Sequence, residues 1–427
     1  MSGQPGSKQH GSAEAGGAPP NILTDPHAGY AHLREQAAAC PMRSLDGSLM
    51  WVVGRHEGVR SVLTDPRFAN DPASVPGGGA PRMQVNAMRK LGLAEDLIPY
   101  LADTLLDSDG ESHSRLRRLV SPAFTARRML ALRPRIERLT DELLDGLEAH
   151  AEDGVADFLS LFAYPLPITV ICELVGVPSA DRPAWLRWTH ALSFDQEHLG
   201  ETIGPLVDYT HALVDRRRSR PADDLISELI RARDGDRLTD RELVTMVLSL
   251  VIAGHDTTAN FLANSVWALL THPDQLALVR AEPELMPQAV QELLRWCGPV
   301  LVSRMRYVTE DADLGWAAFQ AGDAVMAALS GANQDPREFA EADRLDVTRQ
   351  HENRGEAHVS FGAGPHYCLG AALARHEAEI ALNRLFARRP GLTLAVRPEE
   401  LNWQPVSGMR KLERLPLRLD GAGGVTA

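Results

Sequence analysis

The segment at residues 239–270 constrains the fold of this chain more than any other. It is the longest run with apolar residues at helical spacing, and Thr239 followed three residues later by Glu242 predicts a capping box at its start. His272 and Pro273 come directly after it, and proline cannot continue a helix. At 1.5 Å per residue, about 32 residues give a helix of about 48 Å. A helix of that length crosses a whole domain, so the rest of the chain must pack around it.

The remaining pattern is mostly helical. Further helices are predicted over 133–148 and 221–233, where leucine and isoleucine recur at spacings of three and four. Strand-like pieces are short, at residues 50–53, 300–307, 324–327 and 392–396. No internal repeat and no Gly/Ser linker divides the chain. We therefore expect a mainly α fold with a minor β region, as one domain over residues 21–420 that follows a disordered tail at 1–20.

Composition excludes several classes of protein. The 427 residues include 44 Lys+Arg and 57 Asp+Glu, a net charge of −13, which disfavours binding to nucleic acid or anionic lipid. Four cysteines in so long a chain do not make a disulfide scaffold, and they contain no CxxC pair for zinc. The tail lacks the apolar core of a signal peptide, and the apolar stretch at 243–253 is too short to span a bilayer. We expect a cytoplasmic protein without a membrane partner.

The segment at 361–370 reads Phe-Gly-Ala-Gly-Pro-His-Tyr-Cys-Leu-Gly, and a helix-forming run begins at Ala371. Cys368 therefore lies at the entrance of a helix, where N–H groups and the positive end of the helix dipole stabilise a thiolate. Glycines allow a large flat group to approach the backbone. A single thiolate presented in this way suits axial ligation of haem iron, to which it supplies electron density for O–O cleavage.

Cys368 has two other interpretations. One is a structural buried cysteine, the commonest role of a lone cysteine. The other is a Cys–His hydrolase that uses His366 or another histidine. Neither explains the spacing of the segment. The other cysteines, Cys40, Cys172 and Cys297, have no such context and are interpreted as structural.

Polar residues interrupt the long apolar helix at 253–258, which reads Ala-Gly-His-Asp-Thr-Thr. A polar stripe in contact with solvent is the simpler interpretation. Alternatively, Gly254 leaves room for O2 or water in the helix groove, Thr257 offers a hydroxyl, and Asp256 offers a proton. O–O cleavage needs two protons in a site otherwise kept dry, which is the chemistry that this set of groups supports.

With these motifs in order, the chain resembles the cytochrome P-450 family. Residues 361–370 match its highly specific haem-binding signature, and 253–258 resembles its acid–alcohol pair. Glu292 and Arg295 resemble its buried structural ion pair, with Arg349 at the position of the third partner. The resemblance covers nearly the whole chain after the tail, and it implies a helical triangular prism.

The resemblance also implies the haem contacts. The cofactor would be haem b, with Cys368 as its iron ligand. His113, Arg117, Arg306 and His366 match the family's donors to the propionates, although Arg304 competes with Arg306 for its place. The resemblance adds the following backbone or apolar contacts to the haem: Ala253, Gly254, Phe361, Gly362 and Gly370.

The implied function is that of a soluble bacterial haem-thiolate monooxygenase. It would hydroxylate or epoxidise an apolar molecule, such as a polyketide macrolide, with O2 and two electrons from NAD(P)H through ferredoxin reductase and ferredoxin. We expect a monomer. An acidic ferredoxin would dock on the Cys-side face, through Arg115, Arg118, Arg375 and Arg384. The loop at 70–104 is expected to shape the substrate pocket, lined by Met83, Met88, Leu91, Val300, Leu301, Val302, Ser407 and Met409.

Two rival functions remain open at this point. One keeps the haem but uses peroxide, or carries out desaturation or coupling without oxygen insertion. The other is a haem sensor without turnover. The Asp256–Thr257 pair favours ordinary O2 activation over both.

Overall fold

The computed structural model describes residues 25–420 except for 45–46, 79–82, 195–198, 232–237, 351–355 and 405–407. The expected tail at 1–20 and the expected pocket residue Ser407 lie outside the described residues. The helices are α1 Pro26–Gln36, α2 His56–Thr64, α3 Met83–Lys90, α4 Pro99–Ala102, α5 Gly110–Val120, α6 Ala126–Ala149, α7 Pro165–Val175, α8 Arg182–Phe194, α9 Leu199–Ser219, α10 Leu225–Arg231, α11 Asp240–Thr271, α12 Pro273–Ala281, α13 Met286–Cys297, α14 Leu329–Asn333 and α15 Ala371–Arg388.

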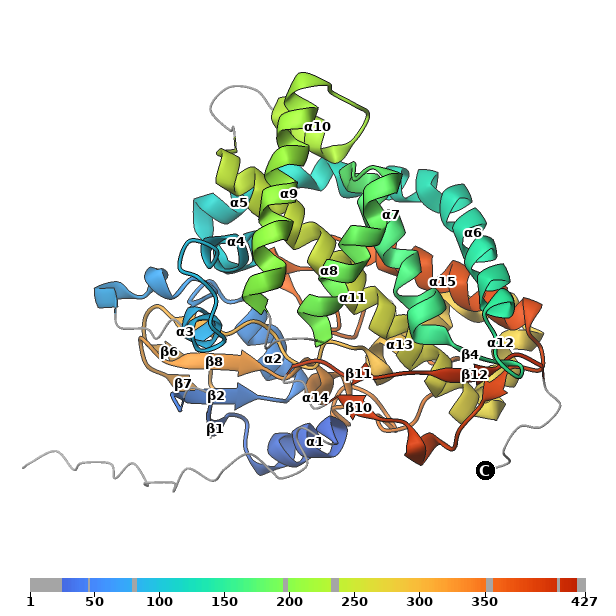
Figure 1. Cartoon of the computed structure of the whole chain (residues 1–427). Helices are drawn as coiled ribbons and strands as arrows, with labels where there is room; N and C mark the ends of the chain where they lie inside the picture. The colour runs from blue at the N-terminus through green and yellow to red at the C-terminus, as the bar shows by residue number, and fades with distance from the viewer. Residues whose placement is uncertain are drawn as a thin grey trace, which may run out of the picture.

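The strands form small sheets in the lower part of the molecule, with most of the helices above them (Figure 1). One sheet has the order β1-β2-β8-β5-β3, and β2 and β8 run parallel with Trp51 opposite Val325. The strand bounds are β1 Cys40–Arg43, β2 Leu49–Val53, β3 Phe68–Ala69, β4 Val155–Asp157, β5 Arg306–Val308, β6 Ala312–Asp313, β7 Ala318–Phe319, β8 Ala324–Ala327, β9 Thr393–Leu394, β10 Trp403–Gln404, β11 Lys411–Leu412 and β12 Pro416–Arg418.

The long helix is confirmed as α11, and it runs through the middle of the molecule (Figure 1). The capping box is present: the Thr239 hydroxyl accepts from the Glu242 N–H, and the Glu242 carboxylate accepts from the Thr239 N–H. The helix packs against α7, α9, α13 and α15. Within the described residues, α11 alone is long and apolar enough to cross a membrane, yet 67% of its most apolar window is buried inside the protein. This burial is typical of a core helix.

Several element boundaries differ from the sequence-based expectation. Helix α6 begins at Ala126, before the expected start at 133. Pro134 lies inside this helix, although proline is more typical of a first turn. Helix α10 is described only over Leu225–Arg231. The strand expected over 300–307 begins at Arg306, since Leu301 and Ser303 donate their N–H groups to Gly408 and Ala327 in irregular backbone.

The expected strand at 392–396 shortens to Thr393–Leu394 and pairs with β12. The loop expected at 70–104 contains the helices α3 and α4. Side chains of both helices pack against the main apolar core, which includes residues of most helices of the molecule. Helices α3 and α4 are therefore packed parts of the fold.

Candidate active site

One short face of α11 is open although the helix crosses the core. Ala253 is exposed, and Gly254 and Thr257 are half-buried, whereas His255, Asp256 and Thr258 are buried. The Thr257 hydroxyl donates to the Ala253 carbonyl at 2.8 Å. An exposed alanine in the middle of a core helix marks internal space beside it. The polar residues at 253–258 therefore divide into an open face with Thr257 and a buried face with Asp256.

Gly254 takes part in the packing of α7 against α11. A Cβ at this position would lie 3.2 Å from Cγ1 of Ile171 on α7. The absence of a side chain therefore allows α7 to approach α11 closely. The expected room for O2 or water at this glycine stays a prediction.

The segment at 361–370, called the cysteine loop below, ends at the first turn of α15, as its glycine pattern predicts. Cys368 is half-buried, and its N–H donates to the Phe361 carbonyl at 2.9 Å. Gly364 has a φ of +70°, and a Cβ there would lie 2.8 Å from the Leu63 carbonyl, so this turn requires glycine. Burial raises the pKa of the Cys368 thiol, while the N–H groups of Gly370 and Ala371 lower it. A bound metal cation would deprotonate the thiol outright.

Four basic side chains gather beside this loop: His113, Arg117, Arg306 and His366. The rings of His113 and His366 lie 4.2 Å apart, and Arg117 donates to the Tyr367 carbonyl at 2.7 Å. Burial, followed by the charges of His366 and Arg117, lowers the pKa of His113 to about 4. Burial also lowers the pKa of Arg306 to about 10. Asp109 adds a carboxylate to this cluster: it lies 3.3 Å from Nε2 of His366, and its charge opposes the lowering of both pKa values.

This cluster fits an anionic group. Nε2 of His113 and Nε of Arg306 are buried without a hydrogen-bond partner among the described residues. Buried polar atoms in proteins are nearly always bonded, so two such orphans indicate a missing ligand. The competing residue Arg304 instead lies 3.7 Å from Asp107 and is 40% exposed. The geometry thus assigns Arg306, and not Arg304, to the cluster.

A second buried ion cluster supports the region that carries Cys368. Nε and Nη2 of Arg295 each donate to the Glu292 carboxylate at 2.7 Å. The side chains of Arg295 and Glu292 are fully buried. Nε of Arg349 donates to the same carboxylate at 3.2 Å. The sequence-based interpretation of these three residues as one structural group therefore matches the geometry.

Asp256 belongs to a network that the sequence did not reveal. Its Oδ2 lies 2.5 Å from Nζ of Lys411, and its Oδ1 accepts from the Tyr164 hydroxyl at 3.2 Å and from Nδ2 of Asn260 at 3.1 Å. Lys411 lies on β11, far from Asp256 along the chain. No local spacing predicts such a contact. Only Asn260, four residues further along α11, follows from helical periodicity.

Comparison with known proteins settles the family. The family model "Cytochrome P450" matches residues 191–388. The chain is 42% identical to cytochrome P450 107B1 of Saccharopolyspora erythraea, over 92% of this chain and 95% of that protein. It is 40% identical to 6-deoxyerythronolide B hydroxylase of the same organism, over 92% of this chain and 95% of that protein. The chain belongs to the cytochrome P450 family.

The fold agrees over almost its whole length with solved P450 structures. The cytochrome P450 enzyme CxnD, which is described for C–S bond formation in chuangxinmycin biosynthesis, superposes with a TM-score of 0.84 at 36% identity. The alignment covers 96% of this chain and 99% of CxnD. This P450 is therefore a monooxygenase-class enzyme with the mainly helical P450 fold, and its family implies a haem cofactor.

The P450 contains a cavity of about 1660 Å³. Its lining includes Met83, Leu301 and Met409, as expected, and also Lys411. Ligand sites usually measure about 300–1,000 Å³, so this cavity is larger than most. Ala253, Thr257 and Cys368 are not among its lining residues.

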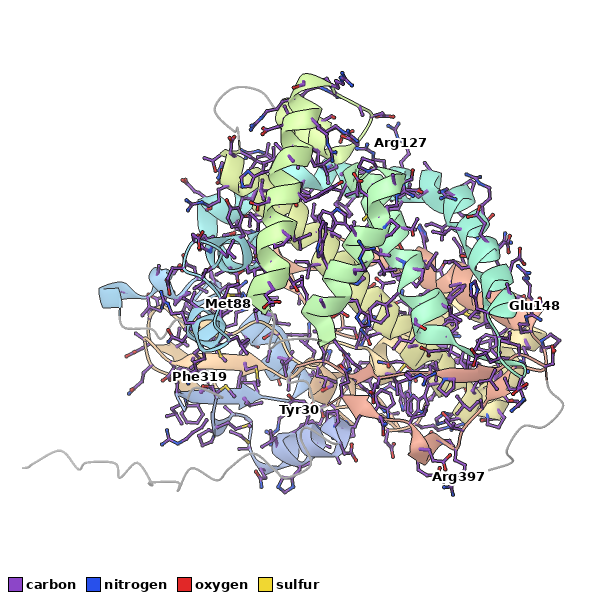
Figure 2. The ribbon with its side chains drawn as sticks, viewed as in Figure 1. Tyr30, Met88, Arg127, Glu148, Phe319 and Arg397 are labelled. Carbon is purple, nitrogen blue, oxygen red and sulfur yellow. The ribbon has the colours of Figure 1, made fainter. Side chains whose placement is uncertain are left out.

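The other four expected pocket residues lie elsewhere. Leu91 is wrong as a lining residue because it is 42% exposed beyond the end of α3. Met88 faces the main core from α3 (Figure 2), Val302 packs against the apolar cluster under β1 and β2, and Val300 bridges Met409 in irregular backbone. None of these three lines the cavity described above. Met88 lies in a helix and Leu91 directly after it, where a loop was expected, and the backbone at 300–302 precedes β5, where a strand was expected.

Arginines expected to dock a redox partner pair with carboxylates of this chain. Arg115 pairs with Glu242, Arg375 with Glu356, and Arg384 with Asp141. Arg118 is exposed on α5, next to Arg117, which contacts the cysteine loop. Pairing reduces the net positive field that an acidic partner would meet.

Proposed function

We propose that this P450 is a haem-thiolate monooxygenase that hydroxylates or epoxidises a bulky apolar metabolite of the polyketide macrolide class. The observation that carries the proposal is the pair of buried, unpartnered nitrogen atoms, Nε2 of His113 and Nε of Arg306, beside the loop that presents Cys368 at the first turn of α15. A flat cofactor with carboxylate edges would accept hydrogen bonds from the unpartnered nitrogen atoms, and its iron would bind the thiolate of Cys368.

The proposed cofactor is haem b, which when ligated by a thiolate activates O2 for insertion into a substrate. Cys368 would hold its iron, and the four basic residues beside the loop would hold its propionates. Phe361, Gly362 and Gly370 would pack along it on the Cys side, and Ala253 and Gly254 on the α11 side. Thr257 would hold a proton-bearing hydroxyl at the open face of α11, with Asp256 as the acid behind it.

The proposed electron source is NAD(P)H, through a ferredoxin reductase and a ferredoxin. The described cysteines Cys40, Cys172, Cys297 and Cys368 are free thiols, which supports a reducing cytoplasmic setting. We further propose that residues 21–420 act as one domain and one monomer, because the cysteine loop, α5, α11 and β5 all contribute to a single site.

The substrate class rests on two observations. The cavity volume exceeds that of ordinary small-molecule sites. A relative at 40% identity is named a 6-deoxyerythronolide B hydroxylase. A screen of macrolactones for a low-spin to high-spin shift of the reconstituted protein tests this assignment. Shifts from small terpenes or peptides, with none from macrolactones, would contradict it.

The haem-thiolate assignment is tested by the absorbance of the reduced protein with carbon monoxide. A Soret band displaced far to the red is expected in the wild type and lost in Cys368→Ser. Retention of that band in Cys368→Ser, or its absence in the wild type, would overturn the assignment. Cys297→Ser, at a buried cysteine outside the loop, is the matched control.

A second candidate function keeps the haem but joins or dehydrogenates its substrate. The likeness to CxnD, described for C–S bond formation, favours it. The mass of the product separates the two: insertion adds one oxygen atom, whereas coupling or desaturation removes two hydrogen atoms.

A further inference from the structure

Arg410, directly before β11, lies between two indole rings. Its guanidinium carbon is 4.7 Å from the ring centroid of Trp267 on α11 and 4.2 Å from that of Trp403 on β10. Nη1 of Arg410 donates to Nε2 of His27 on α1. Side chains from three separate elements therefore hold this cation in one orientation.

His27 is a neutral acceptor in this contact. Burial, followed by the charge of Arg410, lowers the pKa of His27 to about 3. Its other ring nitrogen, Nδ1, lies 2.5 Å from the side-chain amide nitrogen of Gln334. A neutral imidazole orients the guanidinium but adds no negative charge to it.

Arg410 has no carboxylate partner among the described residues. Burial lowers the pKa of its guanidinium to about 10, and the charge of Asp25 opposes this shift without offsetting it. The Asp25 carboxylate accepts from the Ala28 N–H at the start of α1. A charge that is sheltered from water usually has a partner, so this arginine indicates a missing anion.

Arg410 also lines the large cavity. The other described arginines and lysines of the lining are either paired with a carboxylate, as Lys411 and Arg304 are, or exposed, as Arg43 and Arg241 are. Among these side chains, Arg410 alone is both half-buried and without a carboxylate partner. An anion that enters the cavity would therefore meet an unused cation there.

The cavity wall beside α1 is apolar. Tyr30, Met42, Met50 and Leu301 belong to one apolar cluster, and all four line the cavity. Tyr30 follows His27 by three residues on α1, so these two side chains lie on the same face of that helix. A carboxylate brings one negative charge, and its two oxygens match the edge of one guanidinium. The wall thus suits a molecule with one carboxylate and a hydrocarbon body.

We propose that this part of the cavity is a binding site for an amphipathic organic acid: Arg410 binds the carboxylate, and the apolar wall around Tyr30 binds the hydrocarbon chain. His27, Trp267 and Trp403 position the guanidinium. The inference goes beyond the proposed function and does not depend on it, because the site uses neither the cysteine loop nor the open face of α11.

The simpler interpretation is a structural clamp, in which Arg410 ties the last hairpin to α11 and α1. A clamp predicts that Arg410→Met lowers stability, and it predicts no preference for an acid over the corresponding alcohol. A binding site predicts such a preference, because a hydrogen bond between a guanidinium and a carboxylate is worth about tenfold or more in affinity.

The test measures the affinity of the purified full-length protein for decanoate and for decan-1-ol by titration calorimetry at neutral pH. The wild type should bind decanoate at least about tenfold more tightly. In Arg410→Met this preference should disappear through weaker binding of decanoate, with the affinity for the alcohol unchanged. Arg410→Lys keeps the charge and should retain part of the preference. Arg43→Met, at an exposed arginine of the same cavity, is the matched control and should retain all of it.

Equal affinities of the wild type for the acid and the alcohol would overturn the proposal without any variant. A preference that survives in Arg410→Met would also overturn it, because the carboxylate would then bind elsewhere. Arg410→Gln keeps an N–H donor without the charge, and it replaces the methionine variant if that protein does not fold. Calorimetry records binding independently of the carbon monoxide band, so a missing band contradicts the proposed function and leaves this test intact.

Discussion

Cys368 shows how a single residue depends on its loop. The half-buried thiol lies directly before the first turn of α15, and burial alone disfavours its thiolate. Backbone N–H groups of Gly370 and Ala371 oppose that effect. The sequence predicted this position because three glycines and a proline precede a helix-forming run. The magnitude of burial, by contrast, depends on which elements pack over the loop.

Thr257 gives the first prediction at this scale. Thr257→Ala should keep the haem and substrate binding but should lower the amount of product formed per NAD(P)H by at least about tenfold, since a positioned proton donor contributes about 10²–10⁴-fold. The diverted electrons should be recovered as hydrogen peroxide. Thr258→Ala, at the next and buried threonine, is the control and should remain coupled. Full coupling in Thr257→Ala would refute the role of this hydroxyl.

His255 gives a prediction about pH. Its side chain is fully buried, and burial lowers its pKa from 6.5 to about 4. The unfolded chain therefore binds a proton more tightly than the folded protein, so the free energy of unfolding should fall as pH drops from about 6.5 to about 4. The contribution of this residue is about 3 kcal/mol.

Denaturant titrations at pH 7 and pH 4.5 measure this effect. His255→Phe keeps an aromatic ring beside Tyr164 and removes the titrating group, so its stability should fall less at pH 4.5 than that of the wild type. An equal fall in both proteins would mean that His255 does not contribute. The surface residue His150, replaced by Phe, serves as the control.

At the scale of elements, Glu292 joins α13 to the segment before the cysteine loop. Its carboxylate holds Arg295, Arg349 and the N–H of Asp346. The sequence predicted the pairing within α13 from helical spacing. The third partner, Arg349, followed from family resemblance, because it lies beyond the reach of local periodicity.

Glu292→Gln should therefore be costly. It leaves the buried guanidinium of Arg295 and the half-buried one of Arg349 without their counter-charge, and breaking a buried ion pair costs about 3–5 kcal/mol. We expect a loss of that size in the free energy of unfolding, together with weaker haem retention on a desalting column. Glu284→Gln, at an exposed carboxylate just before α13, should change neither. A variant at position 292 with wild-type stability would contradict the structural role.

At the scale of the whole molecule, the net charge of −13 does not tell how charges are paired on the expected docking face. Arg115, Arg375 and Arg384 of the expected docking face are paired with carboxylates, so a partner would meet salt bridges and not a bare positive field. Arg118 is exposed on α5 beside the residue that contacts the cysteine loop.

The resulting prediction concerns the electron donor. The affinity for an acidic ferredoxin should fall as salt rises from 50 to 300 mM, because exposed charges are screened beyond a Debye length of about 10 Å at 0.1 M. Arg118→Glu should weaken binding more than Arg397→Glu, at the far lower edge of the molecule in Figure 2. Salt-independent affinity, measured by titration calorimetry, would contradict an electrostatic docking surface.

The sequence by itself determined the helical class, the central helix with its capping box, the presentation of Cys368 and the ion pair within α13. Each of these depends on residues close in the chain, where helical periodicity and turn chemistry act directly. Only the tertiary structure decided that Arg306 joins the cation cluster, that Leu91 faces outward and that Lys411 meets Asp256. These contacts join residues that are distant in sequence, and their geometry arises only when separate elements pack to bury apolar surface.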